Sequence, residues 1–449
     1  MRILVLSILY YGCAFVGLVN PFFGLLFLIH IIIFRPESLV WGGAYFGRLH
    51  LITAVLVIIG CFLHKRDLAK NAAYPHQKRN IALFLIFILW LGIVTVLANV
   101  SVQMSFDKTV EVIKIFAICT VFTVLVTTEK RLDLYVWVSV ISFGLVSFWG
   151  FLQALAGNQR LDDLWPGGSN YVGAQLALMT PLAIAKAMDK NVRLNVKLLF
   201  LACAVSMVLC IFATESRGAF LGLSAALFTF VLFTRYRARA IIVMAFIALL
   251  SYPWILQPSV ERLSTIFSSA KYEDPTIEGR VFLWKLAIEM WQDNPIAGIG
   301  LDNFSDYRKN YEGRLDRLIQ SDETREIVFG GRARYPHGMY TGVLAETGIV
   351  GLALLLIVLF RNLWLPFPKY FVRDPAYSSL YLQARAAQAG LLGFAIAAIF
   401  GDFQYLEMFY LQMFFIGAVR GYAEVLISQA RLTDNVPRPE MAVAARATI

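Results

Sequence analysis

Long apolar runs separated by short polar connectors make up most of this chain. Runs of about 17–25 apolar residues are typical of helices that cross a membrane. The apolar runs lie at residues 3–19, 22–34, 50–63, 81–100, 110–128, 134–155, 171–188, 196–213, 218–234, 240–256, 341–360, 386–400 and 405–427. The pattern therefore predicts an all-α fold, a polytopic bundle of transmembrane helices.

The number of crossings depends on the first 34 residues, where Asn20 and Pro21 split the apolar sequence. Two separate helices there would give thirteen crossings and an external N-terminus. One broken helix would give twelve crossings, with both ends in the cytoplasm. We favour about twelve, because Arg2 beside Met1 suits a cytoplasmic start.

Lysine and arginine gather in alternate connectors, and connectors rich in these residues stay on the cytoplasmic side of a membrane. The basic connectors carry Lys65, Arg66, Lys70, Lys78, Arg79, Lys130, Arg131, Lys186, Lys190, Arg193, Lys197, Arg235, Arg237, Arg239, Arg361, Lys369, Arg373 and Arg385. The other connectors then face the outside of the membrane, among them residues 101–108, 157–170, 214–217 and 401–404.

One polar interval is much longer than the rest and also falls on the periplasmic side. The expected organisation is an N-terminal transmembrane bundle at 1–256, a periplasmic loop with the catalytic residues at 257–340, and C-terminal transmembrane helices at 341–427. A polar cytoplasmic tail at 428–449 is predicted to be disordered.

Composition agrees with a membrane protein, since 59% of the 449 residues are hydrophobic and only 16% are charged, against about 25% charged in soluble domains. The net charge of +10 sits mostly in the basic connectors, so it reflects orientation and does not indicate a nucleic-acid partner. The cysteines lie within apolar runs, and none is paired at metal-ligand spacing: Cys13, Cys61, Cys119, Cys203 and Cys210.

Within the long loop, residues 280–294 are predicted to form an amphipathic helix that begins at Arg280 and ends before Pro295. Its apolar residues recur at helical spacing: Val281, Trp284, Ile288 and Trp291. Such a helix can lie among the lipid headgroups or pack on the bundle as a lid. The glycine-rich PIAGIGLDNF that follows lacks the GKS or GKT of a P-loop, and we interpret it as a structural turn.

Three polar residues are candidates for chemistry. His337 is the only histidine in the long loop. Because a zinc site needs several ligands, we predict that His337 is a general base and not a zinc ligand. Arg217 begins a span, where it either pairs with Glu215 or holds a phosphate with its planar guanidinium. Lys114 lies inside a span, where it either snorkels, pairs with Glu111 or lines a cavity.

Asp162 and Asp163 offer two adjacent carboxylates in a predicted periplasmic connector. Paired carboxylates there could hold the metal of a metal-dependent glycosyltransferase. Arg160 lies close enough in sequence to neutralise them, and an adjacent acidic pair is more often a solvated loop. We therefore predict no metal and no cofactor.

Several motifs together resemble the O-antigen ligase and Wzy polymerase superfamily. They are TESRGAFLGL, the segment DPTIEGRVFLWKLAIEMWQDNPIAGIGLDNF, and YPHGMYTGVLAETGIVGL. The N-terminal NPFFGLLFLIHIIIFRPESLVWG resembles the O-glycosylation ligases associated with exosortase systems. The resemblance covers most of the chain and implies a GT-C-like helical fold in the bacterial inner membrane.

The resemblance also implies the reaction. Members of this superfamily transfer a glycan from undecaprenyl diphosphate to an acceptor, such as lipid A-core or another surface glycan or protein, without a metal and with inversion. By position, Arg217 and Arg280 match the arginines that hold the diphosphate, and His337 matches the base. Lys114, Arg160 and Tyr335 are further candidates for substrate binding. Gly338 departs from the polar residue that many members carry after the histidine.

Two alternatives stay open at this point. A polymerase of the same superfamily would add repeats to a lipid-linked glycan, and the acceptor would distinguish it from a ligase. A transporter or flippase of lipid-linked sugars would place functional charges along the bundle axis, whereas the candidate residues here gather on the outer side.

The charge pattern makes a testable prediction about topology. Cysteine labelling from outside the membrane should reach a cysteine at position 316 and should not reach one at position 193, because Lys and Arg mark the connector at Arg193 as cytoplasmic. Labelling of both positions from the same side would remove the basis for a periplasmic site.

Overall fold

The computed structural model of the chain describes residues 2–36, 48–68, 75–157, 168–233, 275–311, 314, 322–329, 335–367 and 378–432. Every regular element in these ranges is helical, which confirms the predicted all-α class. The predicted span at 240–256, the connector with Arg160, Asp162 and Asp163, and the tail beyond residue 432 lie outside the described residues.

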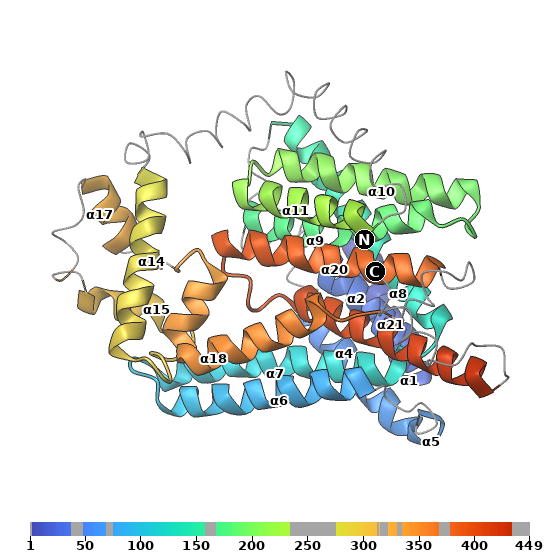
Figure 1. The fold of residues 1–449 in the computed structure, drawn as a ribbon, viewed down its shortest axis with the longest axis horizontal. Coiled ribbons are helices and arrows are strands. Elements are labelled where there is room, and N and C mark those ends of the chain that lie inside the picture. The colour runs from blue at the N-terminus through green and yellow to red at the C-terminus, as the bar shows by residue number, and fades with distance from the viewer. Residues whose placement is uncertain are drawn as a thin grey trace, which may run out of the picture.

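The long helices lie roughly side by side and form one bundle (Figure 1). Its members are α1 (Arg2–Val19), α2 (Pro21–Phe34), α4 (Leu49–Leu63), α6 (Pro75–Val96), α7 (Val102–Leu125), α8 (Glu129–Leu155), α9 (Ser169–Met188), α10 (Leu194–Ala213), α11 (Arg217–Phe233), α18 (Met339–Leu363), α20 (Ser378–Ala397) and α21 (Glu407–Leu432). Short helices α5 (Lys65–Leu68) and η7 (Ala398–Phe400) extend α4 and α20.

The helices of the long polar interval gather at one end of this bundle, at the left of Figure 1. They are α14 (Pro275–Asp293), α15 (Phe304–Tyr307), η5 (Arg308–Tyr311) and α17 (Asp322–Phe329). Helix α14 runs across the direction of the bundle helices and packs against α18. We call this end the capped end.

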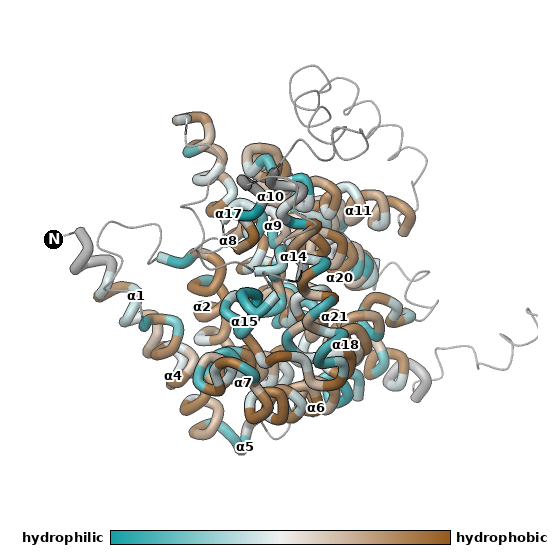
Figure 2. Tube along the Cα trace, turned by 90° about the vertical axis from the view of Figure 1, so that its left-hand side faces the viewer, coloured by the Kyte–Doolittle hydropathy of each residue, from teal (hydrophilic) through white to brown (hydrophobic). Residues whose placement is uncertain are grey.

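Within the described ranges, six helices are long and apolar enough to cross a membrane: Pro75–Val96, Glu129–Leu155, Leu194–Ala213, Met339–Leu363, Ser378–Phe400 and Glu407–Ser428. Four shorter apolar helices accompany them, at Ser7–Val19, Pro21–Phe34, Leu49–Leu63 and Arg217–Phe233. Large apolar side chains such as Leu89, Phe148 and Leu198 are more than half exposed on the outside of the bundle. Water would disfavour so much exposed apolar surface, whereas lipid accommodates it. In Figure 2, which looks onto the capped end, apolar colours dominate α6 and hydrophilic colours mark α15.

The first two helices form a hairpin. The ring of Tyr10 in α1 lies 5.7 Å from that of Phe27 and 6.2 Å from that of His30 in α2. Gly17 and Gly24 face each other near the turn, where the Asn20 side chain accepts a hydrogen bond from the backbone N–H of Phe23. The split at Asn20 therefore separates two antiparallel helices. This favours two crossings over the single broken one that our count of twelve assumed, and the total number of crossings stays a prediction.

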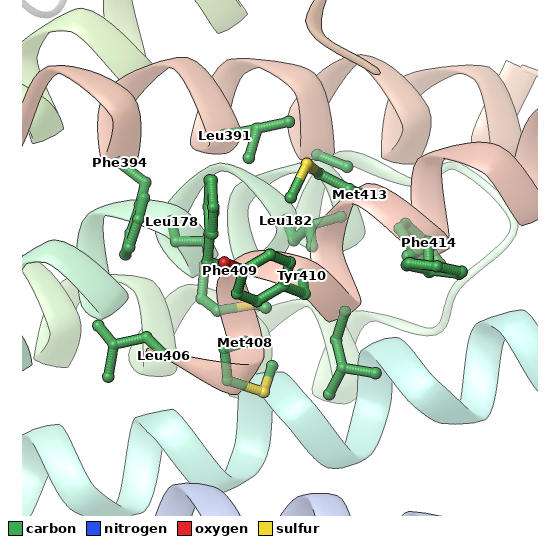
Figure 3. Close-up of a cluster of buried hydrophobic side chains, with 14 of the residues drawn as sticks. Leu178, Leu182, Leu391, Phe394, Leu406, Met408, Phe409, Tyr410, Met413 and Phe414 are labelled. Carbon is green, nitrogen blue, oxygen red and sulfur yellow. The ribbon is translucent and has the colours of Figure 1, made fainter. Parts of the chain in front are cut away.

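Small residues hold the centre of the bundle together. A Cβ built on Gly393 of α20 would lie 2.5 Å from the carbonyl oxygen of Gly222 in α11, and one on Gly390 would overlap the carbonyl of Leu178 in α9. Glycine at these positions lets the helix backbones touch, as is usual where membrane helices pack. Beside this contact lies a core of large apolar side chains from α9, α20 and α21, shown in Figure 3, in which the rings of Phe394 and Phe409 stack at 4.9 Å.

Helix α14 is a lid packed on the bundle, although its buried face is not the predicted one. The buried side chains are Phe282, Leu283, Leu286, Ala287 and Met290, while Ile288 is 39% exposed. Both faces of this helix are apolar, so spacing alone did not decide between them. The helix also begins five residues earlier than predicted, at Pro275, because proline suits the first turn of a helix. Arg280 is therefore in its second turn, and our expectation that it starts the helix was wrong.

The PIAGIGLDNF sequence forms a turn that fills a break in α18. Gly348 interrupts α18 with φ 68°, and Ile296 packs against it so closely that no side chain would fit there. The backbone N–H groups of Ile299 and Gly300 donate to the carbonyls of Ala345 and Glu346, both at 3.0 Å, and Ile349 donates to Pro295 at 3.0 Å. The turn thus replaces the helical bonds that α18 lacks at its break.

The glycine contacts between α11 and α20 predict a stability difference. Gly393→Ala should lower the thermal stability of the purified protein in detergent, by about 1–3 kcal/mol, because its Cβ overpacks a full interface. Gly92→Ala is the matched control, since nothing lies within 4 Å of a Cβ there and alanine favours helix by roughly 0.5–1 kcal/mol. Equal melting temperatures for the two variants would contradict the proposed packing.

Candidate functional site

The short connector between η7 and α21 is the centre of the capped end. It carries Asp402, whose side chain is only 10% exposed. Its carboxylate accepts hydrogen bonds from the backbone N–H groups of His337 at 3.1 Å and Gly338 at 3.3 Å. The phenol of Tyr171, at the start of α9, donates to the backbone carbonyl of Asp402 at 2.7 Å. Asp402 thus ties together α9, α18 and α21.

His337 lies at this junction with its ring accessible. Its side chain is 39% exposed, and Nδ1 lies 3.9 Å from the carboxylate of Asp402. Its φ of 52° is in the left-handed region, which few residues other than glycine adopt, although asparagine, aspartate and histidine are enriched there. The two hydrogen bonds to Asp402 stabilise this conformation and hold the imidazole beside the carboxylate.

Glycine at position 338 is needed because there is no room for a side chain, and not because of its backbone conformation. Its φ of −163° is an extended conformation open to any residue. A Cβ there would lie 2.8 Å from Oγ1 of Thr341 and 2.9 Å from Nε1 of Trp284. A side chain at this position would therefore crowd Thr341 and Trp284.

Helix α14 brings Arg280 to the same place. Trp284 lies one helical turn after Arg280, and its indole N–H donates to the backbone carbonyl of His337 at 3.4 Å. The positive charge of Arg280 acts on Asp402. The lid therefore places Trp284 on His337 and brings the guanidinium of Arg280 close enough to act on the Asp402 carboxylate.

Helix α11 begins with Arg217 close to the same connector. Arg217 is the first residue of α11, and Ser216 caps the helix by accepting a hydrogen bond from Ala219 N–H at 3.2 Å. The next residue, Gly218, packs on Phe400, where an added Cβ would lie 2.9 Å from the Phe400 Cβ. Phe400 in turn lies 6.3 Å from Trp284, ring to ring. Phe400 is two residues from Asp402, so the start of α11, helix α14 and His337 all lie beside the connector that carries Asp402.

Opposing effects act on the pKa of Asp402. Burial raises the pKa of its carboxyl to about 6, while the hydrogen bonds from Gly338 and His337 and the charge of Arg280 act in the opposite direction. Asp402 is therefore mostly ionised at neutral pH. A buried carboxylate beside a histidine can stabilise the imidazolium that forms when the ring takes up a proton.

A cavity of about 550 Å³ opens beside this site. Its walls are apolar side chains of α2, α4 and α7, and its rim is charged or polar. The rim residues are Arg35, His50, Lys108, Glu111, Lys114 and Glu407. Tyr171 lines the cavity as well as contacting Asp402, so the cavity adjoins the histidine site. This arrangement suits a ligand with a long apolar tail and a charged head.

The sequence missed part of this site. Lys114 lines the cavity, as one of the three predicted alternatives, while Glu111 pairs with Lys108 at 3.0 Å. Arg35, His50 and Lys108 were not predicted as site residues, because each lies near the end of an apolar run, where a basic residue is ordinary. Asp402 had one available signal, since it is the only charged residue in its short connector.

Tyr335, two residues before His337, lies at the same end of the bundle and is 41% exposed. Arg160, Asp162 and Asp163 are outside the described residues. Within the ranges that the structure describes, no three His, Cys, Asp or Glu side chains are grouped to hold a metal ion.

The fold and the site together define a helical, multi-pass membrane protein with a cationic site and an adjoining apolar cavity at one end. Residues 202–356 match the family model described as O-Antigen ligase, which confirms the resemblance to the O-antigen ligase and Wzy polymerase superfamily. Arg217, Arg280 and His337 all lie in the matched part. Residues 1–159 match a second model, described as a family of unknown function.

A curated relative is similar over a shorter stretch. It is the Exopolysaccharide production protein ExoQ of Rhizobium meliloti (strain 1021), 32% identical over 88 residues. The similarity covers 19% of this chain and 18% of that protein. Together these matches support a membrane protein of ligase or polymerase type in polysaccharide biosynthesis.

The raised pKa of Asp402 predicts a pH dependence of stability. The pKa of the Asp402 carboxyl is 3.8 when it is exposed in the unfolded chain and about 6 in the folded protein. The folded state therefore binds this proton more tightly. Stability relative to Asp402→Asn should therefore fall as pH rises from about 4 to about 6, by up to about 3 kcal/mol, and then level off. Melting temperatures of both proteins in lipid nanodiscs, measured across this range, provide the test. If the melting temperatures of the two proteins changed with pH in parallel, burial would not raise the pKa of Asp402.

Proposed function

We propose that this protein is a membrane glycosyltransferase of the O-antigen ligase type. It transfers a glycan from undecaprenyl diphosphate to an acceptor hydroxyl at the capped end, on the periplasmic face of the bacterial inner membrane. The acceptor is lipid A-core or another cell-surface glycan or protein. The observation that carries this proposal is that His337, Arg280 and the start of α11 with Arg217 meet at the connector of Asp402, beside a cavity with apolar walls.

The arginines bind the diphosphate of the donor. Their guanidinium groups are always charged and fit phosphate oxygens with paired hydrogen bonds. Each charge-assisted contact contributes about 1.5–3 kcal/mol. As the bond between the sugar and the diphosphate breaks, negative charge grows on the leaving oxygen, and fixed cations stabilise it. No metal is needed for this step.

The cavity holds the first part of the polyprenyl chain. Its apolar walls on α2, α4 and α7 take isoprene units out of contact with the polar site. Lys114 on its rim adds positive charge where the diphosphate would leave the membrane. The donor thus lies with its tail among the N-terminal helices and its head beside α11 and α14.

His337 acts as the general base. It takes the proton of the acceptor hydroxyl while the hydroxyl oxygen attacks the anomeric carbon from the side opposite the diphosphate. The bond to the diphosphate breaks, undecaprenyl diphosphate leaves, and the configuration inverts. Nδ1 faces Asp402, so Nε2 receives the proton and the carboxylate stabilises the imidazolium.

A polymerase is the second candidate. The relative from Rhizobium meliloti is named an exopolysaccharide production protein, and a polymerase would use the same donor and the same base. Only the acceptor differs, since it would be another lipid-linked glycan.

The proposal predicts different defects for the arginines and the histidine. Arg217→Ala and Arg280→Ala should weaken binding of labelled undecaprenyl diphosphate glycan, and the lysine variants should recover little. His337→Ala should bind donor nearly as well as the wild type but transfer it about 10²–10⁴-fold more slowly. Donor binding and single-turnover transfer in nanodiscs separate the two effects.

Arg314→Ala is the matched control. Arg314 belongs to the same polar interval, but its side chain is 57% exposed and pairs with Asp293 at 2.9 Å. It should leave binding and transfer unchanged. Loss of donor binding in His337→Ala with normal turnover of the bound donor would show that the histidine is not the base.

A further inference from the structure

A second polar cluster lies between the cavity and His337. Its centre is Asp302, near the end of the turn that docks on α18. The Asp302 carboxyl accepts a hydrogen bond from the phenol of Tyr335, and the positive charge of Lys108 acts on it. None of these residues is needed to bind the diphosphate or to remove the acceptor proton.

The surrounding turn holds Asp302 in place. Asp302 has a φ of 58°, a left-handed conformation that aspartate and asparagine tolerate better than most residues. The residues on either side are fixed to α7, since Ser105 donates to the carbonyl of Leu301 at 2.9 Å and Asn303 donates to the Ser105 hydroxyl at 2.8 Å. The carboxyl of Asp302 therefore has a defined direction before any ligand binds.

The partners of Asp302 connect the cavity to the histidine. Lys108 lines the cavity and lies 3.0 Å from Glu111 and 5.0 Å from the ring centre of Tyr405, which also line it. Tyr335 is two residues from His337 and 41% exposed. Asp302 is thus linked both to a residue that lines the cavity and to a residue close to His337.

The chemistry of the cluster matches a sugar better than a phosphate. A fixed carboxylate repels a diphosphate, whereas it accepts hydrogen bonds from hydroxyl groups, and a lysine donates to them. An exposed tyrosine ring adds an amphipathic surface on which a sugar can pack. Burial raises the pKa of Asp302, whereas the charge of Lys108 and the hydrogen bond from Tyr335 lower it. A carboxylate has about four acceptor sites, so a bond from one tyrosine does not use its full capacity.

We propose that Asp302, Tyr335 and Lys108 form a subsite for the sugar attached directly to the diphosphate. This inference rests on the proposed function. The subsite selects the first sugar of the donor by its hydroxyl groups and holds its anomeric carbon between the arginines and His337.

Two ligands separate this subsite from the diphosphate site. One is the undecaprenyl diphosphate glycan extracted from cells that make it, and the other is undecaprenyl diphosphate without sugar. Asp302→Asn and Tyr335→Phe in the full-length protein should bind the glycan donor roughly tenfold more weakly, the effect of one or two lost hydrogen bonds. Binding of the sugar-free lipid should change less than twofold. Asp302→Asn keeps the backbone conformation, because asparagine tolerates a positive φ.

Asp107→Asn is the matched control, since Asp107 is an exposed acidic residue near the start of α7 whose carboxylate pairs with Gln103. It should bind both lipids as the wild type does. Equal weakening of both lipids by Asp302→Asn, or no weakening of either, would overturn the subsite while leaving the proposed function intact. If the wild-type protein binds neither lipid, the proposed function fails and the subsite fails with it.

Discussion

Helix α18 breaks at Gly348, and residues 295–300 provide the hydrogen-bond partners that the break leaves open. Unpaired peptide groups inside a membrane protein cost several kcal/mol each. The broken helix and the inserted turn therefore depend on each other. The indole N–H of Trp90 in α6 donates to the carbonyl of Thr347 at 3.0 Å, which ties a third segment to the same break.

This contact determines where the polar interval lies. It fixes the end of α14 against α18, and α14 then carries Arg280 and Trp284 over the start of the same helix. His337 immediately precedes that start. The two segments of the site are more than 50 residues apart in sequence, yet both are positioned by one helix. The same turn holds Asp302 beside the cavity, so the candidate sugar subsite and the histidine site share a rigid support.

Electrostatics at the capped end follow from how the polar groups are buried. Asp402 is held in a poorly hydrated place by two backbone N–H groups, and the cation of Arg280 makes its charge tolerable. A carboxylate in this state stabilises positive charge nearby more strongly than it would in water. The proposed chemistry needs this at His337, where a proton must be accepted, while the guanidinium groups compensate the negative charge of the donor.

The sequence by itself determined the helical class and the apolar runs, and it indicated Arg217, Arg280 and His337 as the candidate site residues. Apolar runs report directly on membrane helices, and the three residues stand in recognisable motifs. It did not determine the buried face of α14, because that helix is apolar on both sides and only its partner α18 decides which side is buried. It could not identify Asp402 as a partner of His337, since the two lie 65 positions apart and a lone aspartate in a short connector is ordinary. Nor could it show that Gly348 and the PIAGIG turn fit together, because that fit depends on backbone groups and not on side-chain pattern. Tertiary packing alone brought these residues to one end of the bundle.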